Sequence, residues 1–125
     1  MSLKFLVVDD SVTMRRIVIN SLRNLSYDNF VEAGDGKEAL DKLLADQTIN
    51  FVITDWNMPN VSGLELVKSI RGNDSLSKLS ILMVTTRGVK EDIIEALNAK
   101  VNNYIVKPFT PQILKEKIDQ IINPT

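Results

Sequence analysis

The sequence has 125 residues, 44% hydrophobic and 25% charged, which is the composition of one ordinary globular domain that can bury a core. It contains no cysteine and no histidine, which excludes disulfides, thiolate zinc sites, cysteine nucleophiles and triads with a histidine base. The net charge is −1 without a long run of one sign, so we expect no binding to nucleic acid. The apolar run at residues 3–8 is too short for a signal peptide or membrane span, and we therefore expect a cytoplasmic protein without membrane insertion.

Short apolar runs of strand length recur along the chain. In chain order, strands are expected at residues 4–8, 29–33, 51–54, 81–84 and 104–106. The first, third and fourth of these runs are continuously apolar rather than alternating. This pattern is typical of strands that helices cover on both faces.

A segment with helical spacing of apolar residues follows each expected strand. The first such helix is expected over residues 14–25. The second starts at Asp35, a predicted N-cap, with the acid Glu38 in its first turn. The third begins at Ser62 and stops at Gly72.

The last two helices complete the series. Residues 89–99 are expected to form a helix that turns Ile93, Ile94 and Leu97 inward. The final helix is expected to begin with Thr110 as N-cap and Pro111 as its first residue. The alternation predicts a single (βα)5 domain over residues 1–125, an α/β fold with a mainly parallel sheet and right-handed crossovers.

In open parallel sheets ligands bind outside the carboxyl ends of the strands, so the residues just after each strand are the candidates. These positions hold Asp9, Asp10, Asp55, Thr85, Thr86 and Lys107. Each has an ordinary alternative: the acids and threonines can cap helices or turns, and the lysine can be a solvated residue before a proline. Three carboxylates that converge at one buried edge are nevertheless costly unless a cation neutralises them.

The chemistry that fits this set is metal-assisted transfer of a phosphoryl group to a carboxylate. An oxygen-rich cluster without imidazole or thiolate suits Mg²⁺, which binds through one or two carboxylates and keeps several waters. Beside the metal, Lys107 and either Thr85 or a backbone N–H would contact the phosphoryl oxygens. No step requires a histidine in this chain.

Four stretches of the sequence resemble the receiver domains of two-component response regulators. They are FLVVDDSVTMRR (5–16), FVITDWNMPNVSGLEL (51–66), ILMVTT (81–86) and NNYIVKPFTP (102–111), and they cover essentially the whole chain. The TMRR and TDWNMP motifs resemble the chemotaxis branch of that family. The resemblance implies a doubly wound parallel sheet with the flavodoxin-like strand order 2-1-3-4-5.

The resemblance also implies the roles of the site residues. Asp55 would be the phosphoacceptor. Asp10, Asp55 and the backbone carbonyl of Asn57 would ligate Mg²⁺, and Asp9 would contribute through water. Lys107 would contact the phosphoryl group and report its presence.

A conformational switch is implied in the same way. Thr85 would turn to hydrogen-bond a phosphoryl oxygen, and Tyr104 would move inward behind it. The output face would comprise the fourth helix, fifth strand and fifth helix, at about residues 89–122. Asn57 and Arg87 occupy the two positions that tune loss of the phosphoryl group in the family.

Two details concern the backbone. The bond before Pro108 is cis in the family. Lys100 stands where the family usually has glycine, and Asn102 or Asn103 is then the candidate for a left-handed conformation.

The implied function is that of a single-domain chemotaxis response regulator without an attached effector domain. It would accept a phosphoryl group from a chemotaxis histidine kinase and then bind the flagellar motor switch to control the direction of rotation. We expect a monomeric signalling protein rather than an enzyme, with self-phosphorylation from small donors, self-dephosphorylation and a possible dedicated phosphatase.

Three alternatives remain at this stage. A phosphorelay intermediate or phosphate sink would share the site. A phosphatase of the haloacid-dehalogenase type would carry its nucleophile after the first strand in a D-x-D pattern, whereas Asp9 and Asp10 are adjacent. A flavodoxin-type FMN protein would need a hydroxyl- and glycine-rich phosphate loop where this chain has DDSVTM.

Overall fold

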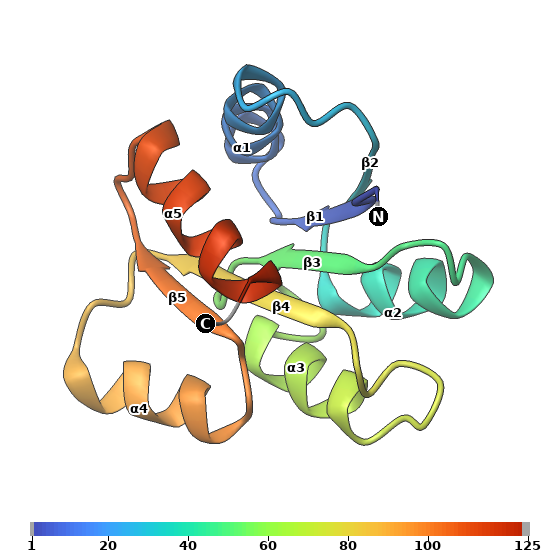
Figure 1. Ribbon diagram of the computed structural model, residues 1–125. Helices are drawn as coiled ribbons and strands as arrows, with labels where there is room; N and C mark the ends of the chain where they lie inside the picture. The colour runs from blue at the N-terminus through green and yellow to red at the C-terminus, as the bar shows by residue number, and fades with distance from the viewer. Residues whose placement is uncertain (1, 124–125) are drawn as a thin grey trace.

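The computed structural model describes residues 2–123, so the outermost residues of the domain expected over 1–125 lie outside the described part. A five-stranded parallel sheet forms its centre (Figure 1). The strands are β1 (Phe5–Val8), β2 (Phe30–Ala33), β3 (Phe51–Thr54), β4 (Ser80–Thr85) and β5 (Asn103–Val106). Their order is β2-β1-β3-β4-β5, which confirms the expected fold.

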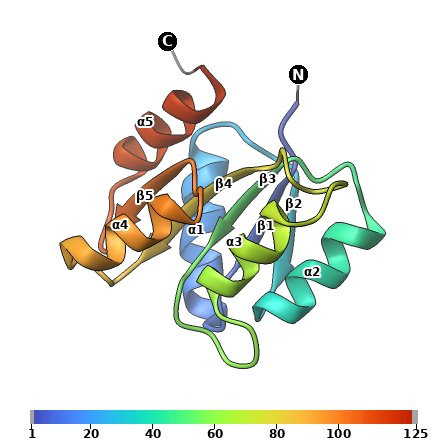
Figure 2. The ribbon, with the colours of Figure 1, turned by 90° about the horizontal axis from the view of Figure 1, so that it is seen from below.

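Five helices cover the sheet on both faces (Figures 1 and 2). They are α1 (Val12–Asn24), α2 (Gly36–Ala45), α3 (Gly63–Arg71), α4 (Lys90–Asn98) and α5 (Pro111–Ile122). Helices α1 and α5 pack on one face around Phe5, Phe51 and Leu82. Helices α2, α3 and α4 pack on the other, around Leu6 and Met83. None of the helices within residues 2–123 is long and apolar enough to span a membrane.

The helix starts follow the local sequence signals closely. Asp35 and Thr110 are N-caps as predicted. Ser62, which was expected to begin the third helix, is its N-cap and forms a reciprocal capping box with Glu65. The cap of α1 is Ser11, whose hydroxyl accepts from the Met14 amide. Neither Asp9 nor Asp10 is therefore the N-cap of α1, although the Asp9 carboxylate accepts from the Ser11 amide at 2.9 Å.

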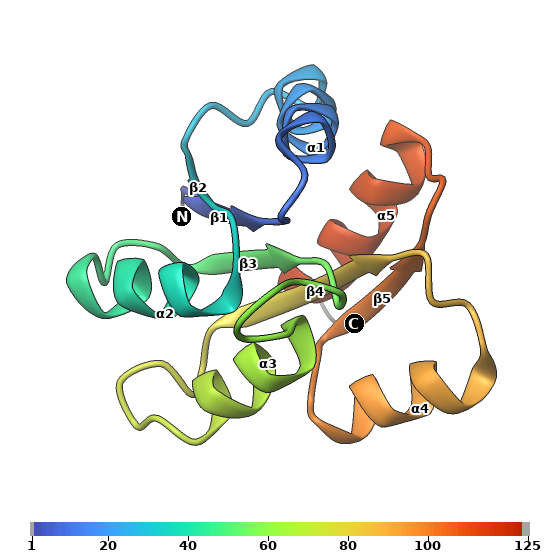
Figure 3. The same cartoon turned by 180° about the vertical axis from the view of Figure 1, so that it is seen from behind.

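The predicted inward face of α4 is partly wrong. Ala96 is the buried residue of this helix, and Ile93 packs partly against the core. Ile94 and Leu97 are 44% and 47% exposed. The helix lies beside the edge strand β5 (Figure 3), and a helix over a sheet edge buries a narrower stripe than one over the centre.

Two helices end on left-handed residues that are not glycine. At the end of α4, Lys100 has φ 76°, its amide donates to the Leu97 carbonyl, and the Val101 amide donates to the Ala96 carbonyl. This is the Schellman arrangement, in which glycine is the usual left-handed residue. The expectation that Asn102 or Asn103 takes this conformation is thus wrong. Ser26 (φ 74°) ends α1 in the same way.

A side chain in the left-handed region costs free energy that glycine avoids. We therefore expect Lys100→Gly to raise the free energy of unfolding by about 1 kcal/mol, measured by urea denaturation. The matched control is Lys100→Ala, which removes the charge and the long side chain but keeps the Cβ atom. Equal stabilisation by both substitutions would contradict a backbone origin.

Candidate functional site

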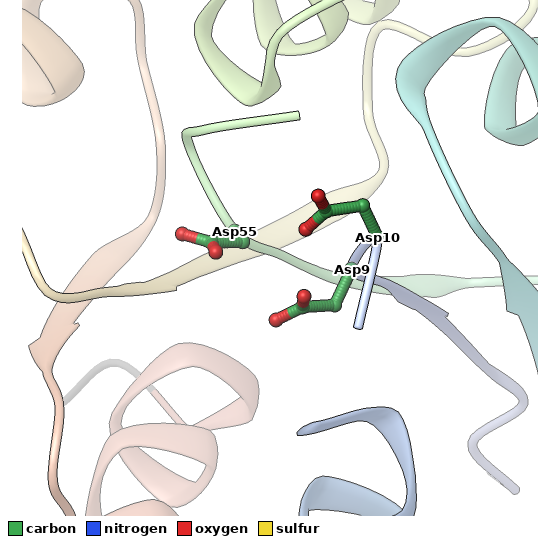
Figure 4. Close-up of side chains that lie close together, drawn as sticks. All are labelled: Asp9, Asp10 and Asp55. Carbon is green, nitrogen blue, oxygen red and sulfur yellow. The ribbon is translucent and has the colours of Figure 1, made fainter. Parts of the chain in front are cut away.

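The parallel register brings the predicted acidic residues to one edge of the sheet. Val8 of β1 pairs with Thr54 of β3, so the residues that follow them, Asp9 and Asp55, leave the two strands at the same level. Asp9, Asp10 and Asp55 each place a carboxylate oxygen within 4.8 Å of the others. In Figure 4 the side chains of Asp9 and Asp10 extend from the end of β1 towards Asp55, which follows β3. The structure therefore confirms the expectation that these three carboxylates lie close together.

One ammonium group lies within this cluster. Lys107, which follows β5, places Nζ 3.0 Å from Asp9 Oδ2 and 3.3 Å from Asp55 Oδ2. The three side chains are largely buried, with exposed fractions of 10%, 6% and 13% for Lys107, Asp9 and Asp55. The formal charges of three carboxylates and one ammonium sum to −2, which equals in size the charge that a divalent cation supplies.

Burial raises the pKa of Asp9 above its ordinary value, against the opposing effects of the Ser11 amide and Lys107. The folded chain thus holds the Asp9 proton more tightly than the unfolded chain does. Consequently the free energy of unfolding falls as the pH rises from the ordinary pKa of 3.8 towards the raised value. Above the raised pKa, the buried Asp9 carboxylate lowers the free energy of unfolding by its full amount. A bound cation would offset this loss of stability.

The donors present fit Mg²⁺. All three are hard carboxylate oxygens, and the two-charge deficit matches the ion. The expected fourth contributor, the backbone carbonyl of Asn57, belongs to the loop that directly follows Asp55. The chain has no imidazole or thiolate, the ligands typical of a zinc site.

Close backbone packing positions Asp55, and glycine makes this packing possible. The Asp55 carboxylate accepts from the Trp56 amide at 2.6 Å, and the Asp55 amide donates to the Val8 carbonyl. The Gly63 amide then donates to the Trp56 carbonyl at 2.8 Å, which closes the loop. A Cβ atom on Gly63 would lie 1.8 Å from the Asp55 carbonyl oxygen. Gly63 is a residue that the sequence analysis missed, because no local pattern reveals this approach.

The predicted switch residues lie on the neighbouring strands β4 and β5, where Thr85 is the last residue of β4 and Tyr104 pairs with Met83. Thr85 is fully buried, and its hydroxyl accepts weakly from the Arg87 amide at 3.4 Å. Tyr104 is 8% exposed, and its hydroxyl donates to the Arg87 carbonyl at 2.7 Å. Burial is the main cause that raises the pKa of Tyr104 to about 12. The tyrosine ring expected to move inward is thus already buried in this structure.

Arg87 makes contacts that the sequence did not indicate. Its guanidinium donates twice to Asn57 Oδ1, from Nε at 3.0 Å and from Nη2 at 2.8 Å. Its Nη1 lies 3.4 Å from Asp92 Oδ2. Its Cζ atom lies 4.6 Å from the centre of the Trp56 ring, a cation–π distance. Arg87 therefore covers both residues that follow Asp55.

The Lys107-Pro108 peptide bond is cis, as expected.

Comparisons with known proteins agree with this geometry. The chain matches the family described as "Response regulator receiver domain" over residues 5–119. It is 53% identical to a "Chemotaxis protein CheY homolog" of Campylobacter jejuni, over 96% of this chain and 92% of the relative. It is 52% identical to "Chemotaxis protein CheY1" of Helicobacter pylori, over 96% of this chain and 97% of the relative.

Solved structures give the same result. The chemotaxis response regulator CheY4 of Vibrio cholerae superposes with a TM-score of 0.87 at 33% identity, over 97% of this chain and 99% of that one. A putative response regulator from Chloroflexus aurantiacus superposes with a TM-score of 0.90 at 30% identity, over 98% of both chains. The chain therefore belongs to the response regulator receiver domain family, and its sequence and fold are similar to those of chemotaxis proteins of the CheY type.

Proposed function

We propose that this chain accepts a phosphoryl group on Asp55 from a chemotaxis histidine kinase and, once phosphorylated, binds the flagellar motor switch to control the direction of rotation. The observation that carries the proposal is the position of the Asp55 carboxylate. It lies at the strand ends beside Lys107 and two further carboxylates, in a cluster that could hold a divalent cation. The names of the chemotaxis relatives support the pathway.

The transfer step follows from the charges at the site. An oxygen of Asp55 attacks phosphorus, the bond from phosphorus to the donor nitrogen breaks, and its electron pair leaves with the imidazole, which gains a proton. This chain has no histidine, so the donor imidazole must come from the partner. Lys107 holds the Asp55 carboxylate at 3.3 Å and is placed to contact the arriving phosphoryl group. Mg²⁺ held by Asp10, Asp55 and the Asn57 carbonyl, with Asp9 through water, would neutralise phosphoryl charge.

The remaining residues link the site to a binding surface. Thr85 would hydrogen-bond the phosphoryl group, and Tyr104 would repack behind it. The surface of α4, β5 and α5 carries exposed apolar side chains suited to binding a partner. They are Ile94, Leu97, Val106 and Ile113. Asn57 and Arg87, which contact each other beside Asp55, would set the rate of self-dephosphorylation.

The proposal extends to the setting of the protein. It would act in the cytoplasm as a monomer and phosphorylate itself from small donors. A dedicated phosphatase that removes the phosphoryl group would be a further partner. The second candidate, a phosphorelay intermediate or phosphate sink, would use the same site without binding the motor switch.

The direct test is phosphorylation by a small donor. With Mg²⁺ and phosphoramidate, we expect wild type to gain one phosphoryl group by intact mass spectrometry and Asp55→Asn to gain none, because the nucleophilic carboxylate is gone. Asp41→Asn, which removes an exposed acid on α2, is the matched control and should be labelled normally.

An unlabelled wild type would contradict the phosphoacceptor role. Turnover of a phosphate ester that survives Asp55→Asn but is lost in Asp9→Asn would indicate the phosphatase alternative instead.

Crowding of the three carboxylates predicts an effect on stability. Asp10 makes no ion pair within residues 2–123, so Asp10→Asn should remove repulsion without breaking the Lys107 contacts. In EDTA we expect its Tm to exceed that of wild type by about 2–4 °C, measured by calorimetry. An equal or lower Tm would show that repulsion at this edge is negligible.

A further inference from the structure

Arg87 joins parts of the molecule that are far apart in sequence. It lies in the connection between β4 and α4 (Figure 1). Its guanidinium contacts Trp56 and Asn57, the two residues directly after Asp55. The same guanidinium pairs with Asp92 in the first turn of α4. The Arg87 guanidinium thus bridges the loop that follows Asp55 and the first turn of α4, where the proposed output surface starts.

The contacts of this cation are weak ones for an arginine. Asn57 is neutral, so its carbonyl oxygen offers no full charge to the guanidinium. Asp92 is charged, but the pair is 3.4 Å apart and partly solvated, with side-chain exposures of 38% and 27%. Partly exposed ion pairs contribute little, whereas an arginine fork binds phosphate oxygens strongly and in bidentate geometry. The two polar partners of Arg87 are therefore ones that a phosphoryl group can outcompete.

The Arg87–Asp92 ion pair links the first turn of α4 to the preceding loop. Among the described helices, α1, α2, α3 and α5 have an N-cap side chain that accepts a backbone amide hydrogen bond. The N-cap of α4 is Val89, which has no such bond. An uncapped helix end has low local stability, and Arg87–Asp92 is the ion pair that ties it to the preceding loop.

We propose that Arg87 is a mobile cation that transfers to the phosphoryl group. When Asp55 is phosphorylated, the Arg87 guanidinium leaves Asn57 and Asp92 and binds a phosphoryl oxygen, and this frees the first turn of α4 to rearrange. The inference rests on the proposed function of Asp55. An acyl phosphate carries about two negative charges where the carboxylate carried one, which supplies the driving force.

The backbone of Arg87 gives the transfer a second consequence. Its carbonyl accepts the hydrogen bond of the Tyr104 hydroxyl. A shift of residue 87 towards Asp55 therefore moves the acceptor that fixes Tyr104 on β5. Both elements next to Arg87, α4 and β5, would then respond to one movement.

Competition between Asp92 and the phosphoryl group makes the inference testable. The probe is beryllium fluoride with Mg²⁺, a phosphoryl analogue that binds carboxylates reversibly, and its Kd is measured by fluorine NMR titration. We expect Arg87→Gln to raise the Kd about ten-fold, because a charge-assisted contact is lost. We expect Asp92→Asn to lower the Kd about three-fold, because Arg87 loses its competing partner. In the Arg87→Gln background, Asp92→Asn should change nothing.

Two matched controls separate this contact from a general effect of charge. Lys90→Gln and Glu91→Gln each remove one exposed charge from the same helix start. We expect both to leave the Kd within about two-fold of wild type, because solvent screens exposed charges.

A second measurement follows α4 itself. Hydrogen exchange of amides 90–93 should accelerate when wild type binds the analogue, and the increase should be absent in Arg87→Gln. An unchanged or raised Kd in Asp92→Asn, or the same decrease in both backgrounds, would overturn the transfer. Failure of wild type to bind the analogue would instead contradict the proposed function, on which the inference depends.

Discussion

The organisation of this site follows from a charge deficit at the carboxyl edge of the sheet. The parallel register of β1 and β3 places Asp9 and Asp55 side by side, and Asp10 adds a third carboxylate. Lys107 compensates one negative charge and contacts two of the three acids. Asp9 is buried, and burial raises its pKa, whereas Asp10 lies exposed to solvent. The charges and oxygen donors of the site thus suit a divalent cation, and in the proposed function this cation and Lys107 would share the phosphoryl oxygens.

Contacts around Asp55 connect this deficit to the rest of the fold. Gly63 lets the loop after β3 pack closely against the backbone of Asp55. This packing sets the position of the backbone at Trp56 and Asn57. Arg87 covers those two residues and reaches α4 through Asp92. The side chain of Arg87 thus connects the loop after Asp55 to α4 through Asp92, and its backbone carbonyl connects to β5 through Tyr104. In the proposed function, a change of charge at Asp55 would act on α4 and β5 through these contacts. These elements carry the exposed apolar residues of the proposed output surface.

The sequence predicted those features that depend on local pattern. Apolar runs located the strands, Ser62 and Thr110 marked helix starts, and the parallel topology implied that the residues after the strands would meet. It did not predict features set by three-dimensional packing. The spacing of apolar residues gives the direction of the apolar face of a helix but not the width of the sheet surface that the helix covers. For this reason Ile94 and Leu97 of α4 were wrongly predicted to be buried. The contacts of Arg87 depend on the path of a loop and on side-chain rotamers, and no motif encodes either.

The central claim is that the edge formed by Asp9, Asp10 and Asp55 binds one divalent cation because of its two uncompensated charges. Titration of Mg²⁺ into the wild-type protein, followed by the emission of Trp56, the single tryptophan, tests this most directly. We predict a saturable change with one ion per chain that is lost in Asp9→Asn and Asp10→Asn and remains in Asp41→Asn. Absence of saturable binding, or equal binding by all four proteins, would contradict the account.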